Sequence, residues 1–113
     1  MEKFVYFFHE EGVLKKLSPQ QMQDYLQKWL DWIKVLKDND AYILGEPIEP
    51  TGKQISGKNK IISDSSFTKE NNINGFIFIK ATDLENAISL AMGCPIYQVD
   101  GKIEVRQIRK IAF

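Results

Sequence analysis

The sequence has few of the residues that build disulfides and metal sites. It contains one cysteine and one histidine among 113 residues. A lone cysteine excludes an internal disulfide, and one histidine, one cysteine and scattered acids lack the ligand spacing of a zinc site. No glycine-rich phosphate loop leads from a strand into a helix. We therefore expect neither a bound metal nor a cofactor.

Excess charge and long apolar runs are also missing. Fifteen basic residues balance fifteen acidic ones, so there is no broad positive field for nucleic acid or anionic lipid. The opening segment is too short in its apolar part, and too acidic in its flanks, for a signal peptide. No segment is long enough to span a membrane. These absences predict a cytoplasmic protein that binds neither nucleic acid nor a membrane.

What is present is the composition of a globular domain. Hydrophobic residues make up 43% of the chain and charged residues 27%, and a chain of this length buries about two-thirds of its unfolded surface. No low-complexity run or long linker divides it. We expect one domain over residues 1–113.

The first half predicts a strand, a helix and an interrupted strand. Residues 4–8 form a continuous aromatic and β-branched run. Ser18, Pro19 and Gln21 supply the N-cap, the first-turn proline and the capping box of a helix that ends near residues 37–40. Apolar residues at helical spacing form its buried stripe, namely Met22, Leu26, Trp29, Ile33 and Leu36. A short strand then starts at residue 41 and is broken by two glycines and two prolines between residues 45 and 52.

The second half predicts a hairpin and then a second strand, helix and strand. Residues 53–63 form two short arms around a Gly-Lys-Asn turn, and residues 75–79 form an apolar strand. We expect the following helix to be capped by Thr82, with Glu85 completing a capping box, and to end at Gly93 in a left-handed conformation. The last segment alternates as a strand, with Glu104 and Arg106 on one face.

This order of elements is that of a ferredoxin-like split βαβ fold of the α+β class, with an inserted β-hairpin. Both helices then cover one face of the sheet, yet two strands are apolar on both faces. Leaving the second face in water exposes several large side chains, each worth roughly 1.5–3 kcal/mol when buried. Another copy of the chain is the economical cover, so we predict a homodimer.

Several blocks of the sequence together resemble one known family. They include LSPQQMQDYLQKWLDWI, GEPIEPTGK, ISDSSFTKE, NGFIFIKATDLENAISLAMGCPI and IEVRQI. These blocks are similar to the YCII-related proteins, in the branch named for an Asp-Gly-Pro-Phe motif. That motif stands here as Asp64, Ser65, Ser66 and Phe67, so its flanks are present and its centre is replaced. The resemblance implies a dimeric α+β barrel.

The resemblance says less about chemistry. A more enzyme-like branch of the family has a proposed His and Asp pair, with the histidine on the first helix and the aspartate after the second. The matching places here hold Trp29 and Cys94. The resemblance thus implies that a proton-transfer dyad is absent, which removes both groups of a general acid-base mechanism.

Two residues are candidates for a catalytic base. His9 is the only imidazole, and it lies at the end of the first strand, where a base can reach a pocket. Hydrogen-bonded structure is the commoner role of such a histidine. Asp64 precedes a turn, and its carboxylate is expected to accept backbone N–H groups there. The family motif also makes Asp64 a candidate ligand-binding residue.

Three further residues are candidates for ligand binding. Phe67 closes the motif turn. Arg106 shares a strand face with Glu104, so the two side chains either face a common cavity or pair with each other at a sheet edge. Trp32 lies beside the helix stripe, where it lines a cavity wall, lines a protein contact or belongs to the core, and the core is the favoured interpretation. Cys94 follows a helix C-terminus, which disfavours a thiolate, and is expected to be buried.

Three functions remain open from the sequence. The first is a dimeric protein that binds a small organic molecule or acts as an accessory protein. The second is an enzyme that acts on a small organic substrate by proton transfer or elimination, with His9 or Asp64 as base. The third is a structural or regulatory partner. The missing dyad favours the first and third.

Overall fold

The computed structural model describes residues 1–64 and 72–111. The elements, in chain order, are β1 (Glu2–His9), η1 (Leu14–Lys16), α1 (Pro19–Asp38), β2 (Tyr42–Pro47), β3 (Gln54–Ser56), β4 (Ile61–Ser63), β5 (Gly75–Ala81), α2 (Leu84–Ala91), η2 (Pro95–Val99) and β6 (Lys102–Gln107).

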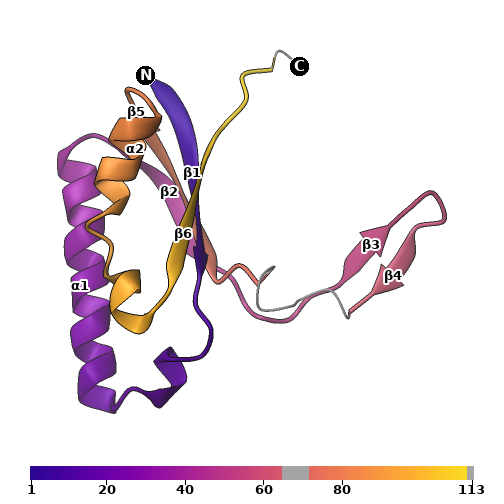
Figure 1. Cartoon of the computed structure of the whole chain (residues 1–113), viewed down its shortest axis with the longest axis horizontal. Coiled ribbons are helices and arrows are strands. Elements are labelled where there is room, and N and C mark those ends of the chain that lie inside the picture. The colour runs from indigo at the N-terminus through magenta and orange to yellow at the C-terminus, as the bar shows by residue number, and fades with distance from the viewer. Residues whose placement is uncertain (65–71, 112–113) are drawn as a thin grey trace.

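The main sheet has the strand order β2-β5-β1-β6, and its neighbours are antiparallel. Both α-helices lie on one face of this sheet (Figure 1). The order and the one-sided helices confirm the predicted ferredoxin-like α+β fold. The predicted hairpin is also confirmed, because β3 and β4 pair only with each other in a separate two-stranded sheet.

Helix α1 begins as predicted but buries a different set of residues. The Ser18 hydroxyl accepts the Gln21 N–H, and the Gln21 side chain accepts the Ser18 N–H, so the capping box is present. Among the helix residues, Tyr25, Trp32 and Leu36 are buried. Leu26, which was expected in the buried stripe, is 54% exposed. The side of α1 that faces the sheet is centred one residue away from the predicted stripe. Leu26 therefore lies at the edge of that side.

Strand β2 is longer than the sequence predicted. We expected Gly45 and Pro47 to break it, but pairing with β5 continues through both. Two features of its position explain this. Strand β2 is an edge strand, where a missing proline N–H costs no ladder bond on the open side. A side chain at Gly45 would bring its Cβ to 2.6 Å from Ile77 Cγ1, so glycine permits a close approach of the two strands.

Helix α2 has different caps from those predicted. Asp83, not Thr82, is the N-cap, and its carboxylate accepts the Asn86 N–H at 2.8 Å. Asn86, not Glu85, returns the bond by accepting the Thr82 N–H at 3.1 Å. Gly93 is not among the residues with positive φ in the described chain. The chain passes from α2 directly into η2, with the Cys94 N–H bonded to the Ala91 carbonyl, so no left-handed residue is needed.

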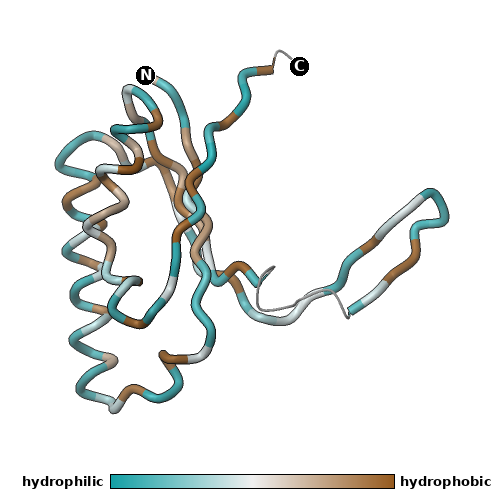
Figure 2. Tube along the Cα trace, viewed as in Figure 1, coloured by the Kyte–Doolittle hydropathy of each residue, from teal (hydrophilic) through white to brown (hydrophobic). Residues whose placement is uncertain are grey.

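The core lies between the helices and the nearer face of the sheet. Phe4, Tyr6 and Phe8 alternate along β1 toward it, and Ile77 and Ile79 do the same from β5. Tyr6 donates its hydroxyl hydrogen to the Ala87 carbonyl at 2.5 Å, which ties the sheet to α2. Hydropathy along the trace follows this layering, with apolar segments concentrated where helices meet the sheet (Figure 2).

We call the opposite side of the sheet the far face. The strand registers place Val5 and Phe7 of β1 there, beside Phe76 and Phe78 of β5 and Leu44 of β2. The rings of Phe76 and Phe78 are 5.4 Å apart, and both side chains are partly exposed. Neither α-helix covers this face (Figure 1). The structure therefore retains the two-sided apolar character that the sequence predicted.

Candidate functional site

A cavity of about 350 Å³ lies between α1 and the edge of the sheet formed by β2 and β5. The sheet and the segments next to it contribute Phe8, Glu10, Leu14, Tyr42, Gly45, Glu46, Pro47, Asn74, Gly75, Phe76, Ile77 and Ile96. Helix α1 contributes Tyr25, Leu26, Trp29 and Ile33. Side chains one helical turn apart on α1 thus face the ends of two strands across a mainly apolar space.

Aromatic rings form the inner wall of the cavity. The Trp29 ring meets the Phe8 ring edge-on at 5.0 Å between centroids. It also contacts the rings of Tyr25 and Trp32, at 6.2 Å and 5.5 Å. Such edge-to-face packing holds each ring in one orientation. The inner wall of the cavity is therefore made of aromatic rings that pack against one another.

The structure places the two tryptophans differently from each other. Trp32 is only 4% exposed, and its Nε1 donates to the Leu90 carbonyl at 3.0 Å, so it joins α1 to α2 in the core. Trp29, which was expected in the core stripe, packs against the core and also lines the cavity. Trp32 was a candidate ligand-binding residue; it contacts Trp29 but is not among the residues that line this cavity.

Polar groups at one end of the cavity are already bonded to the protein. The Glu10 carboxylate accepts the N–H groups of Val13 and Leu14, the second at 3.1 Å, and so caps η1. The Asn74 side-chain oxygen accepts the Glu10 N–H at 2.5 Å. Burial raises the pKa of Tyr25, which keeps its hydroxyl neutral. These groups shape one end of the cavity and add few uncommitted charges.

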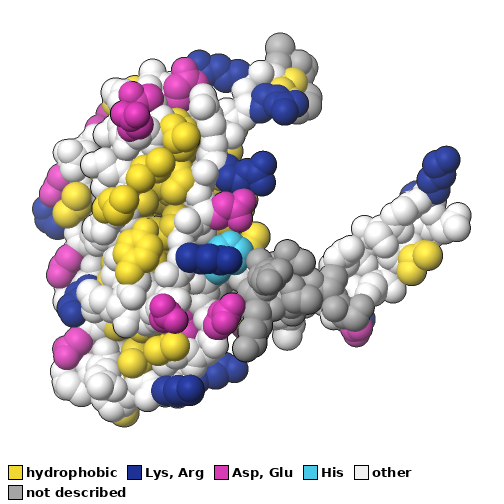
Figure 3. Space-filling view, in the orientation of Figure 1, with side chains coloured by type: hydrophobic (Ala, Val, Ile, Leu, Met, Phe, Trp, Pro, Cys, Tyr) yellow, Lys and Arg dark blue, Asp and Glu magenta, His cyan; other side chains and the backbone are white. Residues whose placement is uncertain are grey.

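His9 lies on the far face of the sheet and not in the cavity. Its Nδ1 donates to the Asn72 carbonyl at 3.1 Å. Its Nε2 lies 3.6 Å from Glu104 Oε1 and has no hydrogen-bond partner in the described part of the chain, although the residue is only 5% exposed. The single histidine is visible beside acidic and basic side chains in Figure 3.

The structure brings His9 together with two other residues named from the sequence. Glu104 also accepts from Arg106, with Arg106 Nη1 at 3.4 Å from Glu104 Oε2. Glu104 and Arg106 therefore pair with each other on the edge strand β6. This is the second of the two arrangements that the sequence left open, the first being a common cavity. The three side chains form a small charged cluster at the β1–β6 side of the far face.

Asp64 lies neither in the cavity nor in the cluster of His9, Glu104 and Arg106. It is 76% exposed, and its carboxylate lies 3.7 Å from Lys53 Nζ at the base of the β3–β4 hairpin. Phe67, the other candidate in the motif turn, lies outside the described residues. The expected bonds from Asp64 to the backbone of that turn therefore stay a prediction.

Cys94 is buried, as expected. Burial raises the pKa of its thiol to about 12, so the thiol stays protonated and is a poor nucleophile. Within residues 1–64 and 72–111, no group of three or more His, Cys, Asp or Glu side chains could hold a metal ion. No helix in the described chain is both long and apolar enough to cross a membrane.

The sequence did not identify the cavity residues Phe8, Glu10, Tyr25 and Asn74. One signal was present: Tyr25 and Trp29 are four residues apart and Trp32 follows three later, so the apolar side of α1 is wider than one stripe needs. The roles of Glu10 and Asn74 depend on a contact between segments 64 residues apart in the sequence. Local patterns carry no record of such a contact.

Comparisons with known proteins agree with this fold. The family model of the YCII-related domain matches residues 1–112. No curated protein matches the sequence. Among solved structures, 5-chloro-2-hydroxyhydroquinone dehydrochlorinase (TftG) of Burkholderia phenoliruptrix, in complex with 2,5-dihydroxybenzoquinone, is similar over 96% of this chain and 94% of its own. The TM-score is 0.57 and the sequence identity is 14%, so the likeness concerns the fold.

Proposed function

Since this chain belongs to the YCII-related domain family, we propose that it is a small-molecule-binding protein that works as a homodimer. The cavity between α1 and the β2–β5 edge takes a small, planar, largely apolar organic ligand. The third function that the sequence left open, a partner without a ligand, does not explain why aromatic rings line a cavity.

One observation carries this proposal: a cavity of about 350 Å³ walled by Phe8, Tyr25 and Trp29. Its size falls at the lower end of the range of roughly 300–1,000 Å³ that is usual for ligand pockets. Aromatic rings that pack edge to face favour a planar ligand, because such a ligand can stack on the face of one ring and contact the edge of another. The structural neighbour TftG holds a six-membered quinone, which is in keeping with such a guest.

The homodimer is supported by the far face. Phe7, Phe76 and Phe78 are only partly covered there, and Leu44 beside them is exposed. Sheets pack face to face through such surfaces, and an isologous pair covers the patch on both copies at once. Sedimentation of the wild-type chain at micromolar concentration should give twice the chain mass, and a monomer at all concentrations contradicts the dimer.

A pair of matched variants tests the ligand site. Leu26 and Leu30 are both exposed leucines on α1, but only Leu26 lines the cavity. Leu26→Trp should fill the mouth and weaken ligand binding at least about tenfold, a change of about 1.4 kcal/mol. Leu30→Trp adds the same ring elsewhere and should leave the affinity unchanged.

Calorimetric titration with indole and with 2,5-dihydroxybenzoquinone measures both variants and the wild type. These two rings differ in polarity but share the flat shape that the cavity favours. If neither binds the wild type, or if Leu26→Trp binds as well as Leu30→Trp does, the proposed site is wrong.

An enzyme that removes a proton from a small substrate is the second candidate, and His9 favours it. Its Nε2 is buried and lacks a hydrogen-bond partner in the described chain, and Glu104 stands close enough to stabilise an imidazolium. Asp64 supports this candidate less, because it is largely exposed and paired with Lys53. In a far-face dimer the partner would exclude water from the His9 site.

Chloride release from 5-chloro-2-hydroxyhydroquinone tests this candidate. The dehydrochlorinase activity of TftG suggests that substrate. If His9 is the base, wild type releases chloride, His9→Gln does not, and Asp64→Asn retains the wild-type rate. Release that is unaffected by His9→Gln assigns the base to another residue.

A further inference from the structure

The β3–β4 hairpin extends away from the rest of the chain. We call residues 53–64 the arm. Its strands pair through Gln54 with Ser63, Ile55 with Ile62, and Ser56 with Ile61, and the turn between them contains Gly57 and Lys60, both with positive φ. The arm rises on the far-face side of the sheet, opposite the helices (Figure 1). It is a regular hairpin without a supporting layer of its own.

Three of the side chains of the arm are large and apolar, and they are exposed. Ile55, Ile61 and Ile62 are 62–68% exposed. Ile55 and Ile62 are directly opposite each other and so lie on one face of the ribbon. An isolated two-stranded hairpin is at best marginally stable in water and needs a further strand or a packed layer. The arm therefore has an apolar face that lacks a cover within the described chain.

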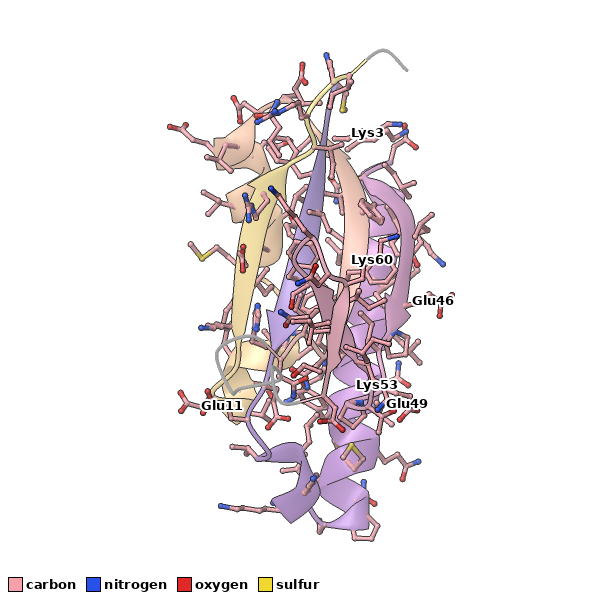
Figure 4. All side chains as sticks on the ribbon, turned by 90° about the vertical axis from the view of Figure 1, so that its right-hand side faces the viewer. Lys3, Glu11, Glu46, Glu49, Lys53 and Lys60 are labelled. Atoms are coloured by element: carbon pink, nitrogen blue, oxygen red, sulfur yellow. The ribbon has the colours of Figure 1, made fainter. Side chains whose placement is uncertain are left out.

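The charge of the arm differs from that of the rest of the chain. It carries Lys53, Lys58 and Lys60 against Asp64 alone, and because the whole chain is neutral, the remainder is net negative by two. In Figure 4, which looks onto the far face, Lys60 lies in front of the sheet. Glu11, Glu46 and Glu49 lie around the lower and right-hand margins of that view. The far face also carries basic side chains, among them Lys3 and Lys80, so the lysines of an arm are matched only to the acidic margins of another copy.

We propose that the arm is an intersubunit clasp, which packs its Ile55 and Ile62 face against a second copy of this chain. The inference rests on the homodimer proposed above and adds a surface to it. A copy seated on the far face lies beside the arm, because the arm rises from that same side. The aromatic patch and the arm then form one continuous interface, and two-fold symmetry places each arm against the other subunit.

The fold disfavours the chain's own body as the cover. Every described residue of the arm except Ser63 is exposed, and the strands of the arm pair with no strand of the main sheet. A different protein is the remaining alternative. The second copy is favoured because it offers the aromatic far face to the apolar residues of the arm and acidic margins to its lysines.

Sedimentation equilibrium of an arm variant tests the clasp. The double variant Ile55→Ser/Ile62→Ser should raise the dimer dissociation constant at least about tenfold. Leu30→Ser is the matched control, because Leu30 is as exposed as these isoleucines but lies on α1. It should dimerise like wild type. Since all three residues are exposed, the variants should fold, and indole titration of the cavity verifies that they do.

The outcomes separate the clasp from the dimer and from the ligand site. A wild-type monomer overturns the dimer and the clasp together. A wild-type dimer whose constant is unchanged by the double variant overturns the clasp alone. Unchanged indole binding in the double variant, beside a weakened dimer, supports the clasp and leaves the cavity proposal intact.

Isotope-mixed cross-linking identifies what the arm touches. Chains labelled with 14N and 15N are mixed, allowed to exchange subunits and treated with an amine-reactive cross-linker. The clasp predicts links from Lys58 or Lys60 to Lys3, Lys80 or Lys102 that join a light chain to a heavy one. Links from the arm that join residues of a single chain only would overturn the proposal.

Discussion

Phe8 and His9 are consecutive residues of β1, yet they serve opposite faces of the sheet. The Phe8 ring packs 5.0 Å from the Trp29 ring in the cavity, whereas His9 Nε2 lies 3.6 Å from Glu104 on the far face. The pleat of a strand sends neighbouring side chains to opposite sides. The two candidate functions of this protein are therefore separated by the thickness of one sheet.

This separation predicts independent effects at the two positions. His9→Gln should leave the affinity for indole unchanged, because His9 does not line the cavity. Phe8→Ala should weaken indole binding and also destabilise the fold, by about 3–5 kcal/mol for a buried phenylalanine. Calorimetric titration in the absence of urea measures the affinity for indole, and urea unfolding measures the stability of the fold. Weaker indole binding by His9→Gln would contradict the assignment of the ligand to the helix side.

The two tryptophans should differ in what they contribute to stability. Trp32→Phe removes the N–H that bonds the Leu90 carbonyl and leaves space in the core, so we expect a loss of about 1–3 kcal/mol. Trp29→Phe borders an existing cavity and should cost less than about 1.5 kcal/mol. Urea unfolding followed by circular dichroism compares them. The reverse order would show that Trp29, as first predicted, is the core residue.

Asp64 should tolerate loss of its charge. Its pairing with Lys53 is exposed on both sides, and such pairs contribute at most about 1 kcal/mol. Asp64→Asn retains an acceptor oxygen for the turn and should change neither the melting temperature nor indole affinity measurably. Asp64→Ala should be the more destabilising of the two if the carboxylate accepts backbone N–H groups. An Asn variant that melts normally but no longer binds indole would show that the charge itself is required.

Because the Cys94 thiol is buried, we expect the folded protein to lose stability at alkaline pH. Burial raises the pKa of the folded thiol to about 12 from an ordinary value of 9.0. Between these values the unfolded chain has lost the proton and the folded chain still holds it. This group therefore lowers the free energy of unfolding by about 1.4 kcal/mol for each pH unit above pH 9. Below pH 9 its full contribution to stability is present.

Urea unfolding at pH 8, 9 and 10 measures this slope. The Cys94→Ala variant is the control, because it removes the thiol and should flatten the dependence between pH 9 and 10. Above pH 10, Tyr6 adds a fall of its own, since burial raises the pKa of its phenol as well. Equal slopes in wild type and Cys94→Ala would show that the thiol is not buried in solution.

Local signals in the sequence were sufficient for most of the fold. The Ser18 and Gln21 capping box predicted the start of α1 because its hydrogen bonds join residues three apart. The apolar run from Gly75 and the glycine turn of the hairpin predicted strands for the same reason: each depends on neighbours in the chain. The predicted caps of α2 were wrong by one residue, because Thr82 and Asp83 are both good N-cap residues and the local sequence does not choose between them.

The candidate sites were decided by contacts that no local pattern contains. The sequence predicted an apolar side on α1, but the rotation of that helix against the sheet determined that Trp32 is buried and Trp29 lines the cavity. Gly45 stays in β2 only because β5 passes so close to it. His9, Glu104 and Arg106 were separate candidates until the pairing of β1 with β6 joined residues almost a hundred positions apart. Composition and periodicity determine which side chains are available, whereas long-range strand pairing and helix rotation determine which of them meet.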